Sequence, residues 1–99
     1  MQKFTSVNEL VNTLKPDDPV YCVRPNSVKK SVEFFKNNFP GKVLYAVKTN
    51  PNEKIIKIII NSGIQNFDVA SINEIKLIRK IHNKVKIYFM HTIKSRGSI

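Results

Sequence analysis

Lys48 is the residue whose position most clearly suggests chemistry. It ends the apolar, strand-like run LYAV at residues 44–47 and is followed at once by the loop sequence TNP. A lysine held at a largely apolar strand end has its charged form destabilised by desolvation, which makes the amine a better nucleophile near neutral pH. Such an amine condenses with aldehydes, and pyridoxal phosphate is the most common aldehyde cofactor held in this way. On chemistry alone, a lysine that reaches from the rim of a barrel into solvent is the simpler interpretation.

Two further polar residues lie at the ends of apolar runs later in the chain. Asp68 lies in the run NFDVA, and His91 follows the run VKIYFM. In parallel α/β architectures, functional side chains collect at the carboxyl ends of strands, where the loops to the helices begin. The sequence therefore predicts that Lys48, Asp68 and His91 face the same rim of a sheet. Asp68 also has a structural explanation, as an anion that stabilises a helix start.

Short apolar strands alternate with amphipathic helices along the chain, and these elements must position the three residues. Strands are predicted at residues 19–24 (PVYCVR), 43–47, 66–70 and 85–90. Helices are predicted at residues 6–15, at 28–39 from the spacing of Val28, Val32, Phe35 and Phe39, at 50–63 and at 71–81. Strands that alternate with helices of this length indicate right-handed βαβ units and a parallel sheet.

Capping residues decide between helix and strand in the isoleucine-rich segment that contains IIKIII. Its five isoleucines favour a strand by propensity. Asn50 as an N-cap, Pro51 at the first helical position and Glu53 at the capping-box position nevertheless predict a helix. Gly63 is predicted to end it.

Length, composition and cysteine content limit the class of protein. The chain has 99 residues, of which 41% are hydrophobic and 24% are charged, as expected for one globular domain with a modest core. Its single cysteine, Cys22, cannot form an internal disulfide, so a reducing cytoplasm is the expected compartment. The N-terminus lacks the apolar core of a signal peptide, and IIKIII is far shorter than the ~20 residues that span a bilayer. We therefore expect a cytoplasmic chain without membrane segments.

The formal net charge of +10 invites a nucleic-acid interpretation through phosphate neutralisation. However, the lysines are scattered along the whole length, and no helix-turn-helix, zinc ligand set or aromatic RNA-binding signature accompanies them. Basicity alone predicts only weak, salt-sensitive association. A basic, nucleic-acid-associated α/β domain stays as an alternative, but no specific nucleic-acid partner is expected.

Several motifs in matching order resemble one enzyme family. These motifs are PVYCV, YAVKTNP, FDVAS followed by INEI, and YFMHTIKSR. They resemble the pyridoxal-phosphate-dependent decarboxylases of ornithine, diaminopimelate and arginine, which use an alanine-racemase-like barrel, and the ornithine/lysine type is the most similar. The resemblance implies an α/β fold with a partial TIM-like barrel of parallel βα units, to which residues 1–99 contribute a single N-terminal portion. It also implies an amino-acid substrate such as ornithine or lysine and a diamine product such as putrescine, for polyamine biosynthesis.

The resemblance assigns roles to four residues. Lys48 matches the family lysine that binds pyridoxal phosphate covalently and is displaced by the substrate amine. Asp68 matches an aspartate near the cofactor and the lysine, and Ala46 matches a small residue beside the cofactor ring. Glu74 matches a family acid in the same segment as Asp68. However, Ser71-x-x-Glu74 is also a complete capping box without any active site.

Parts of the family's active site have no counterpart in the sequence. The three glycines, Gly41, Gly63 and Gly97, form no phosphate-binding loop, and no acid is identified for the pyridine nitrogen. His91 receives no catalytic role. The chain is therefore expected to be a truncated or split N-terminal piece, inactive alone, that lacks the later barrel strands and a C-terminal β-domain. A complementary chain or a homodimer would complete it, and a non-catalytic remnant or interaction domain is the alternative.

Overall fold

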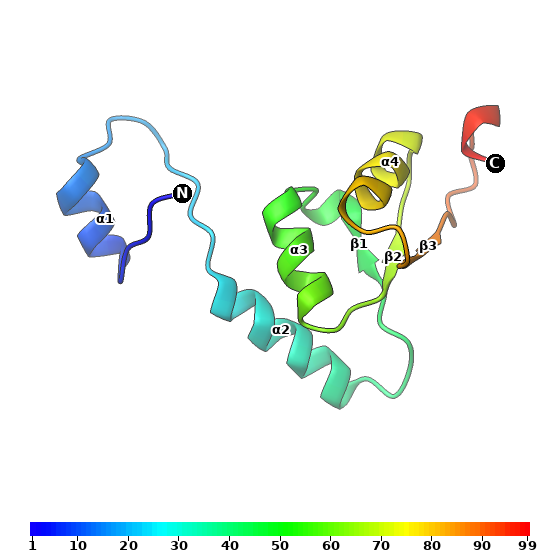
Figure 1. Cartoon of the computed structure of the whole chain (residues 1–99), viewed down its shortest axis with the longest axis horizontal. Helices are drawn as coiled ribbons and strands as arrows, with labels where there is room; N and C mark the ends of the chain where they lie inside the picture. The colour runs from blue at the N-terminus through cyan, green and yellow to red at the C-terminus, as the bar shows by residue number, and fades with distance from the viewer.

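The computed structural model describes all residues 1–99 as an α/β fold (Figure 1). The α-helices are α1 (Val7–Leu14), α2 (Pro25–Asn38), α3 (Glu53–Asn61) and α4 (Ile72–Ile81). The strands are β1 (Tyr45–Ala46), β2 (Asn66–Asp68) and β3 (Lys86–Tyr88), and two 3₁₀ turns are η1 (Val47–Thr49) and η2 (Arg96–Ser98). None of the helices combines the length and the apolar composition needed to cross a membrane.

The three strands form one parallel sheet in the order β1-β2-β3. Helix α3 connects β1 to β2 and α4 connects β2 to β3, which confirms the predicted parallel βα units. In the register, Ala46 lies beside Asp68, and Asp68 lies beside Tyr88. The strands are shorter than predicted because only two or three residues of each run pair with a neighbour. This arrangement is compatible with part of a barrel.

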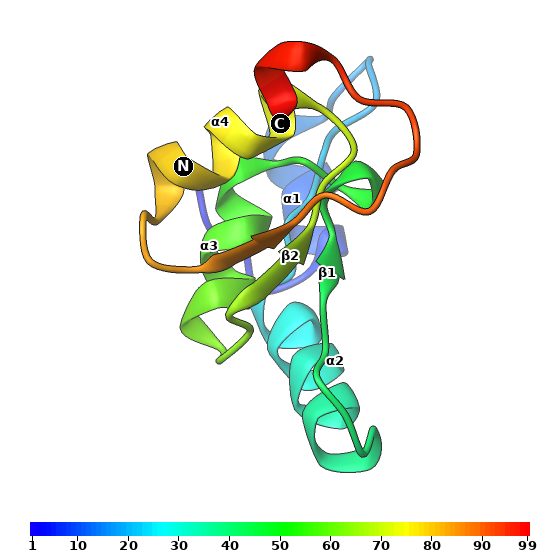
Figure 2. The ribbon, with the colours of Figure 1, turned by 90° about the vertical axis from the view of Figure 1, so that its right-hand side faces the viewer.

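The two faces of the sheet differ in what covers them. In Figure 1, α3 and α4 lie on one side of the strands, and Figure 2 looks onto the opposite face, over which no α-helix lies. Side chains alternate between the two faces along each strand. Phe67 and Val69 point toward the helices and are 0% and 1% exposed, so Asp68 between them points to the other face. We call these the covered face and the open face.

The hydrophobic core lies between the covered face and the helices. Helix α3 supplies four of its residues at the spacing of one helical face, and α4 supplies one. This burial explains why the isoleucine-rich segment is helical despite its preference for strands. The core residues are Val32, Val47, Ile55, Ile56, Ile59, Ile60, Ile64, Phe67, Val69, Ile78 and Val85.

The start of α3 differs from the prediction. The N-cap is Asn52, whose side-chain oxygen accepts hydrogen bonds from the N–H groups of the second and third helical residues. Asn50, the predicted cap, instead accepts a hydrogen bond from the backbone N–H of Asn52. The helix therefore begins at Glu53 rather than at Pro51, because the nearer of the two asparagines satisfies its free N–H groups.

Gly63 ends α3 as predicted. Its φ of 111° lies in the left-handed region that favours glycine. The N–H of Gly63 donates to the carbonyl of Ile60, and the N–H of Ile64 donates to the carbonyl of Ile59. These two bonds form a Schellman motif, which satisfies the last carbonyls of the helix and turns the chain toward β2.

Helix α1 confirms the leading helix predicted at residues 6–15. The Ser6 hydroxyl accepts a hydrogen bond from the N–H of Glu9. The Glu9 carboxylate accepts hydrogen bonds from the hydroxyl and the N–H of Thr5, one residue before the expected partner, and these two bonds hold the pKa of Glu9 below its usual value. Helix α1 has no buried residue, so it adds little to the core.

The strand predicted at residues 19–24 is wrong. This stretch lies in an extended connection between α1 and α2 (Figure 1), which we call the arm and define as residues 15–24. It forms no strand because it does not pair with the sheet, in which β2 is the only neighbour of β1. Only Val23 packs partly against the core, while Tyr21 is 65% exposed. The projecting arm and α1 explain a radius of gyration of 16.2 Å, above the ~13 Å typical of a compact chain of this length.

Candidate functional site

A hollow of about 190 Å³ lies at the carboxyl ends of the strands, and we call it the carboxyl-end hollow. Its polar residues lie at or just after the ends of three successive strands, because the carboxyl ends of parallel strands meet at one edge. This arrangement confirms the prediction that Lys48, Asp68 and His91 share one rim. The lining residues are Lys48, Asp68, Val69, Ala70, Met90 and His91.

Lys48 lies in the turn η1, just after β1. The preceding residue, Val47, is fully buried and fixes the turn against the core. The Lys48 side chain is itself exposed. The expectation that its amine is desolvated is therefore wrong for these 99 residues, because no helix covers the open face beside it (Figure 2). The exposed amine is accessible to an aldehyde from solvent.

Three hydrogen bonds fix the end of this turn at Asn50. The Tyr45 hydroxyl donates to the Asn50 carbonyl at 2.9 Å, and the N–H of Asn52 donates to Asn50 Oδ1 at 3.1 Å. Asn50 Nδ2 donates to the hydroxyl of Tyr21 at 2.8 Å. Burial, with the nearby Tyr21 hydroxyl, raises the pKa of Tyr45 despite its hydrogen bond to Asn50. Tyr45 therefore stays protonated at neutral pH and keeps its donor role.

Asp68 is half-buried at the last residue of β2. It lies on the open face beside Ala46 of β1 and Tyr88 of β3. No ion pair joins it to Lys48, since both ion pairs of the chain involve Glu53. The Asp68 carboxylate is therefore free to interact with a ligand in the hollow.

The Glu74 side chain forms a capping hydrogen bond at the start of α4. Its carboxylate accepts a hydrogen bond from the N–H of Ala70 at 2.8 Å, and the Ser71 hydroxyl accepts one from the N–H of Glu74 at 3.2 Å. These bonds confirm the capping interpretation, and Glu74 also supplies the helix-start anion considered for Asp68. Neither Glu74 nor Ala46 lines the carboxyl-end hollow. Ala46 is half-buried on the open face next to Asp68.

His91 and Met90 complete the hollow from the end of β3. His91 is exposed, and its Nδ1 lies 3.0 Å from the carbonyl oxygen and 3.3 Å from the backbone nitrogen of Ile93. Met90 is 63% exposed and gives the hollow an apolar side. Sequence reasoning missed Met90, although it lies two residues after Tyr88 and the alternation of a strand therefore places both on the open face.

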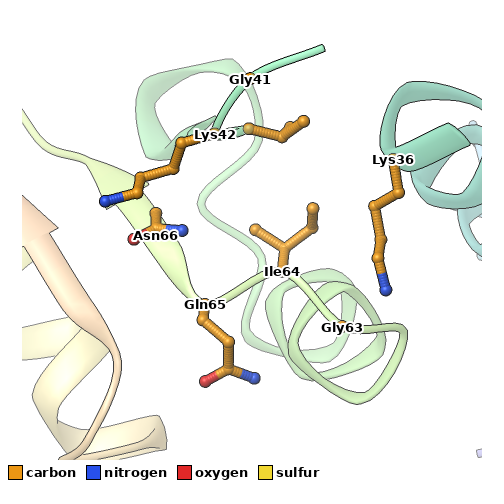
Figure 3. A pocket seen from close by; sticks show the side chains of 8 residues that line it. Lys36, Gly41, Lys42, Gly63, Ile64, Gln65 and Asn66 are labelled. Atoms are coloured by element: carbon orange, nitrogen blue, oxygen red, sulfur yellow. The ribbon is translucent and has the colours of Figure 1, made fainter. Parts of the chain in front are cut away.

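A second hollow, of about 280 Å³, lies at the amino ends of the strands and is called the amino-end hollow (Figure 3). Lys36 points toward Gly63, where an added Cβ would lie 2.3 Å from its Nζ. The Lys36 charge therefore lies near the carboxyl end of α3, where the helix dipole favours cations. Lys42 Nζ donates to the Tyr88 hydroxyl at 3.2 Å. Lys42 therefore has a hydrogen-bond partner within the chain, whereas no hydrogen bond or ion pair holds Lys48.

The carboxyl-end hollow combines a primary amine, a carboxylate and an imidazole. A primary amine binds aldehydes covalently, and a nearby carboxylate stabilises positive charge. The donor set therefore fits pyridoxal phosphate, whose aldehyde Lys48 would hold. No group of three or more His, Cys, Asp or Glu side chains could hold a metal ion.

Comparison with known proteins agrees with this chemistry. A family model described as "Pyridoxal-dependent decarboxylase, pyridoxal binding domain" matches residues 25–99. The match begins after the arm, so the PVYCV motif lies outside it. No curated protein and no solved structure matches the chain. The cofactor of the matched domain is pyridoxal phosphate, and the chain belongs to the pyridoxal-dependent decarboxylase family.

Proposed function

We propose that these residues supply the lysine-bearing part of an amino-acid decarboxylase of the ornithine/lysine type, which forms diamines for polyamine biosynthesis. The observation that carries the proposal is that Lys48 and Asp68 line one hollow in a pyridoxal-binding domain. The preference for ornithine or lysine as substrate rests on the resemblance of the motifs YAVKTNP and FDVAS.

Each residue of the proposed site has a distinct role. Lys48 Nζ would hold the cofactor aldehyde and release it when the substrate amine takes its place. Bound pyridoxal phosphate supplies an electron sink for the pair that remains when the substrate carboxylate leaves as carbon dioxide. Asp68 would place a carboxylate beside the cofactor in the hollow that Lys48 also lines. Ala46 would leave room for a ring on the open face, while Glu74 would support this region from the start of α4.

The free edges of the sheet support a larger barrel. Strands β1 and β3 each have one neighbour only. In a closed barrel of about eight strands such edges are paired, and the inner face of the sheet is enclosed. We propose that these residues contribute three strands to a TIM-like barrel that further chain, a complementary chain or a second copy completes. Without that completion, the 99 residues would bind the cofactor weakly and turn over no ornithine at an enzymatic rate.

Covalent trapping tests the assignment of Lys48. The 99-residue chain is mixed with pyridoxal phosphate, reduced with borohydride and mapped by peptide mass spectrometry. Lys48 should carry more label than any other lysine, because its hollow offers a carboxylate and an apolar side next to the amine. Lys48→Ala should abolish selective labelling and leave the helical circular dichroism unchanged, since an exposed side chain adds little to the core.

Lys42→Ala is the matched control. Lys42 lines the amino-end hollow and is also exposed, so its loss should leave the labelling of Lys48 unchanged. Equal labelling of many surface lysines in the unmodified chain would overturn the proposed site.

A further inference from the structure

The arm contacts the turn that carries Lys48 through one pair of side chains. Asn50 Nδ2 donates a hydrogen bond of 2.8 Å to the hydroxyl of Tyr21. Tyr21 lies 29 positions earlier in the sequence, on the segment between α1 and α2. This contact links the arm, which lies outside the matched family domain, to the turn of the proposed cofactor lysine.

Asn50 forms hydrogen bonds through its side-chain Oδ1 and Nδ2 and through its backbone carbonyl. Its Oδ1 accepts from the N–H of Asn52, and its carbonyl accepts from the Tyr45 hydroxyl. Asn52 in turn caps α3. Asn50 therefore joins the arm, a sheet strand and a helix start at a point two residues from Lys48.

Buried neighbours limit the freedom of both partners in this contact. On the turn, fully buried Val47 holds the residue before Lys48 against the core. On the arm, Val23 packs partly against the same core, two residues after Tyr21. The hydrogen bond between Tyr21 and Asn50 therefore connects two anchored segments, so less chain entropy is lost on forming it than for a bond to a free tail.

We propose that Asn50 and Tyr21 are positioning residues that hold the Lys48 turn, so that the arm orients the amine for the cofactor. Asn50 fixes the carboxyl end of the turn, while Val47 fixes its amino end. Through Tyr21, the arm also holds Asn50, in addition to the contacts that Asn50 makes with Tyr45 of β1 and with the start of α3. The inference rests on the proposed role of Lys48.

Two measurements on the full 99-residue chain test the positioning role. The first is amide hydrogen exchange in residues 48–52, and the second is the rate of borohydride-trapped pyridoxal phosphate labelling at Lys48. Tyr21→Phe keeps the ring and removes only the hydroxyl. It should speed the exchange and slow the labelling by about two- to tenfold, the range expected for one net hydrogen bond. Asn50→Ala should have the larger effect on both, because it removes two side-chain bonds.

Cys22→Ser is the matched control in the arm. The Cys22 side chain is exposed and lies near the carbonyl of Val20 rather than near the turn, so both measurements should stay unchanged. The melting temperature of Tyr21→Phe should fall by no more than about 8 °C, the shift that the loss of one hydrogen bond causes in a chain of this length. A role confined to stability would instead lower the melting temperature without a specific change in the exchange of the turn.

The outcomes separate this inference from the proposed function. Unchanged exchange in Tyr21→Phe would overturn the link between arm and turn, whatever the labelling shows. Faster exchange with unchanged, selective labelling of Lys48 would overturn the positioning role and leave the proposed function intact. Unselective labelling in the parent chain would overturn the proposed function and with it the positioning role, while exchange would still report on the contact.

Discussion

The covered and open faces of the sheet differ in burial, polarity and the partners of their side chains. Toward α3 and α4, Val47 and Phe67 are both 0% exposed. On the open face, Ala46 and Asp68 are half-buried, and Lys48 in the following turn is exposed. Neighbouring residues of the same strand therefore belong to different regions, one to the core and the next to the proposed site.

This difference separates the residues that hold the fold from the residues that could do chemistry. The covered face has its partners within the chain, since α3 and α4 pack on it. The open face carries polar groups that have few partners, among them Asp68 without an ion pair. Substitutions on the covered face should therefore lower stability, and substitutions on the open face should mainly change cofactor binding.

The largest expected effect is that of Phe67→Ala on stability. Phe67 is fully buried and packs edge to face against Tyr45, with ring centroids 6.2 Å apart. Its truncation leaves a cavity and should cost about 3–5 kcal/mol in the free energy of unfolding, measured by urea denaturation. The neighbouring substitution Asp68→Ala, on the open face, should cost less than about 1 kcal/mol. Equal losses for the two variants would contradict the division between the faces.

An intermediate effect is expected for Ala46→Leu, on labelling rather than on stability. The larger side chain would occupy space on the open face next to Asp68, where the proposed site needs room. Trapping of pyridoxal phosphate at Lys48 should fall severalfold, while the urea midpoint should change little because no helix packs on this face.

Asn66→Leu is the matched control for bulk on the same face. Asn66 lies at the amino end of β2 and lines the amino-end hollow, away from Lys48. Its substitution should leave the trapping at Lys48 unchanged. A similar loss in both variants would show that bulk anywhere on the open face disturbs the turn, and the specific role of Ala46 would be wrong.

Local signals in the sequence predicted the βα units and the shared rim. The capping box Ser71-x-x-Glu74 and the glycine at position 63 depend only on neighbouring residues, and both form as expected. The parallel order of the strands then follows from the alternation of elements, which places Lys48, Asp68 and His91 at one edge.

The predictions that failed depend on partners distant in sequence. Residues 19–24 have a strand-like pattern, but a strand forms only where another strand pairs with it. The desolvation of Lys48 required a cover over the open face, which the apolar run at residues 44–47 cannot reveal. The choice between Asn50 and Asn52 as helix cap also escaped local rules, because each has a suitable side chain. The contact between Asn50 and Tyr21 likewise joins residues 29 positions apart, which no local rule predicts.

The smallest expected effect concerns Glu53, which links α3 and α4 on the helical side of the sheet. Its carboxylate pairs with Lys57 at 3.1 Å and with Lys80 of α4 at 3.3 Å. These hydrogen bonds and charges hold the pKa of Glu53 below its usual value. The pairs are solvent-exposed, so their contribution is small and is screened by salt.

Glu53→Gln therefore tests whether packing, rather than charge, holds the covered side together. A depressed folded pKa contributes stability above the ordinary glutamate pKa of about 4.3, and this contribution is lost as the pH falls through the lowered value. At pH 7 the variant should have a slightly lower urea midpoint than the parent chain, and the difference should vanish in acid or in high salt. Glu33→Gln, which removes an exposed glutamate of α2 that has no ion pair, should show no such pH-dependent difference. A loss for Glu53→Gln as large as that for Phe67→Ala, or one that persists below the lowered pKa, would show that the ion pairs and not the buried aromatic ring dominate the covered side.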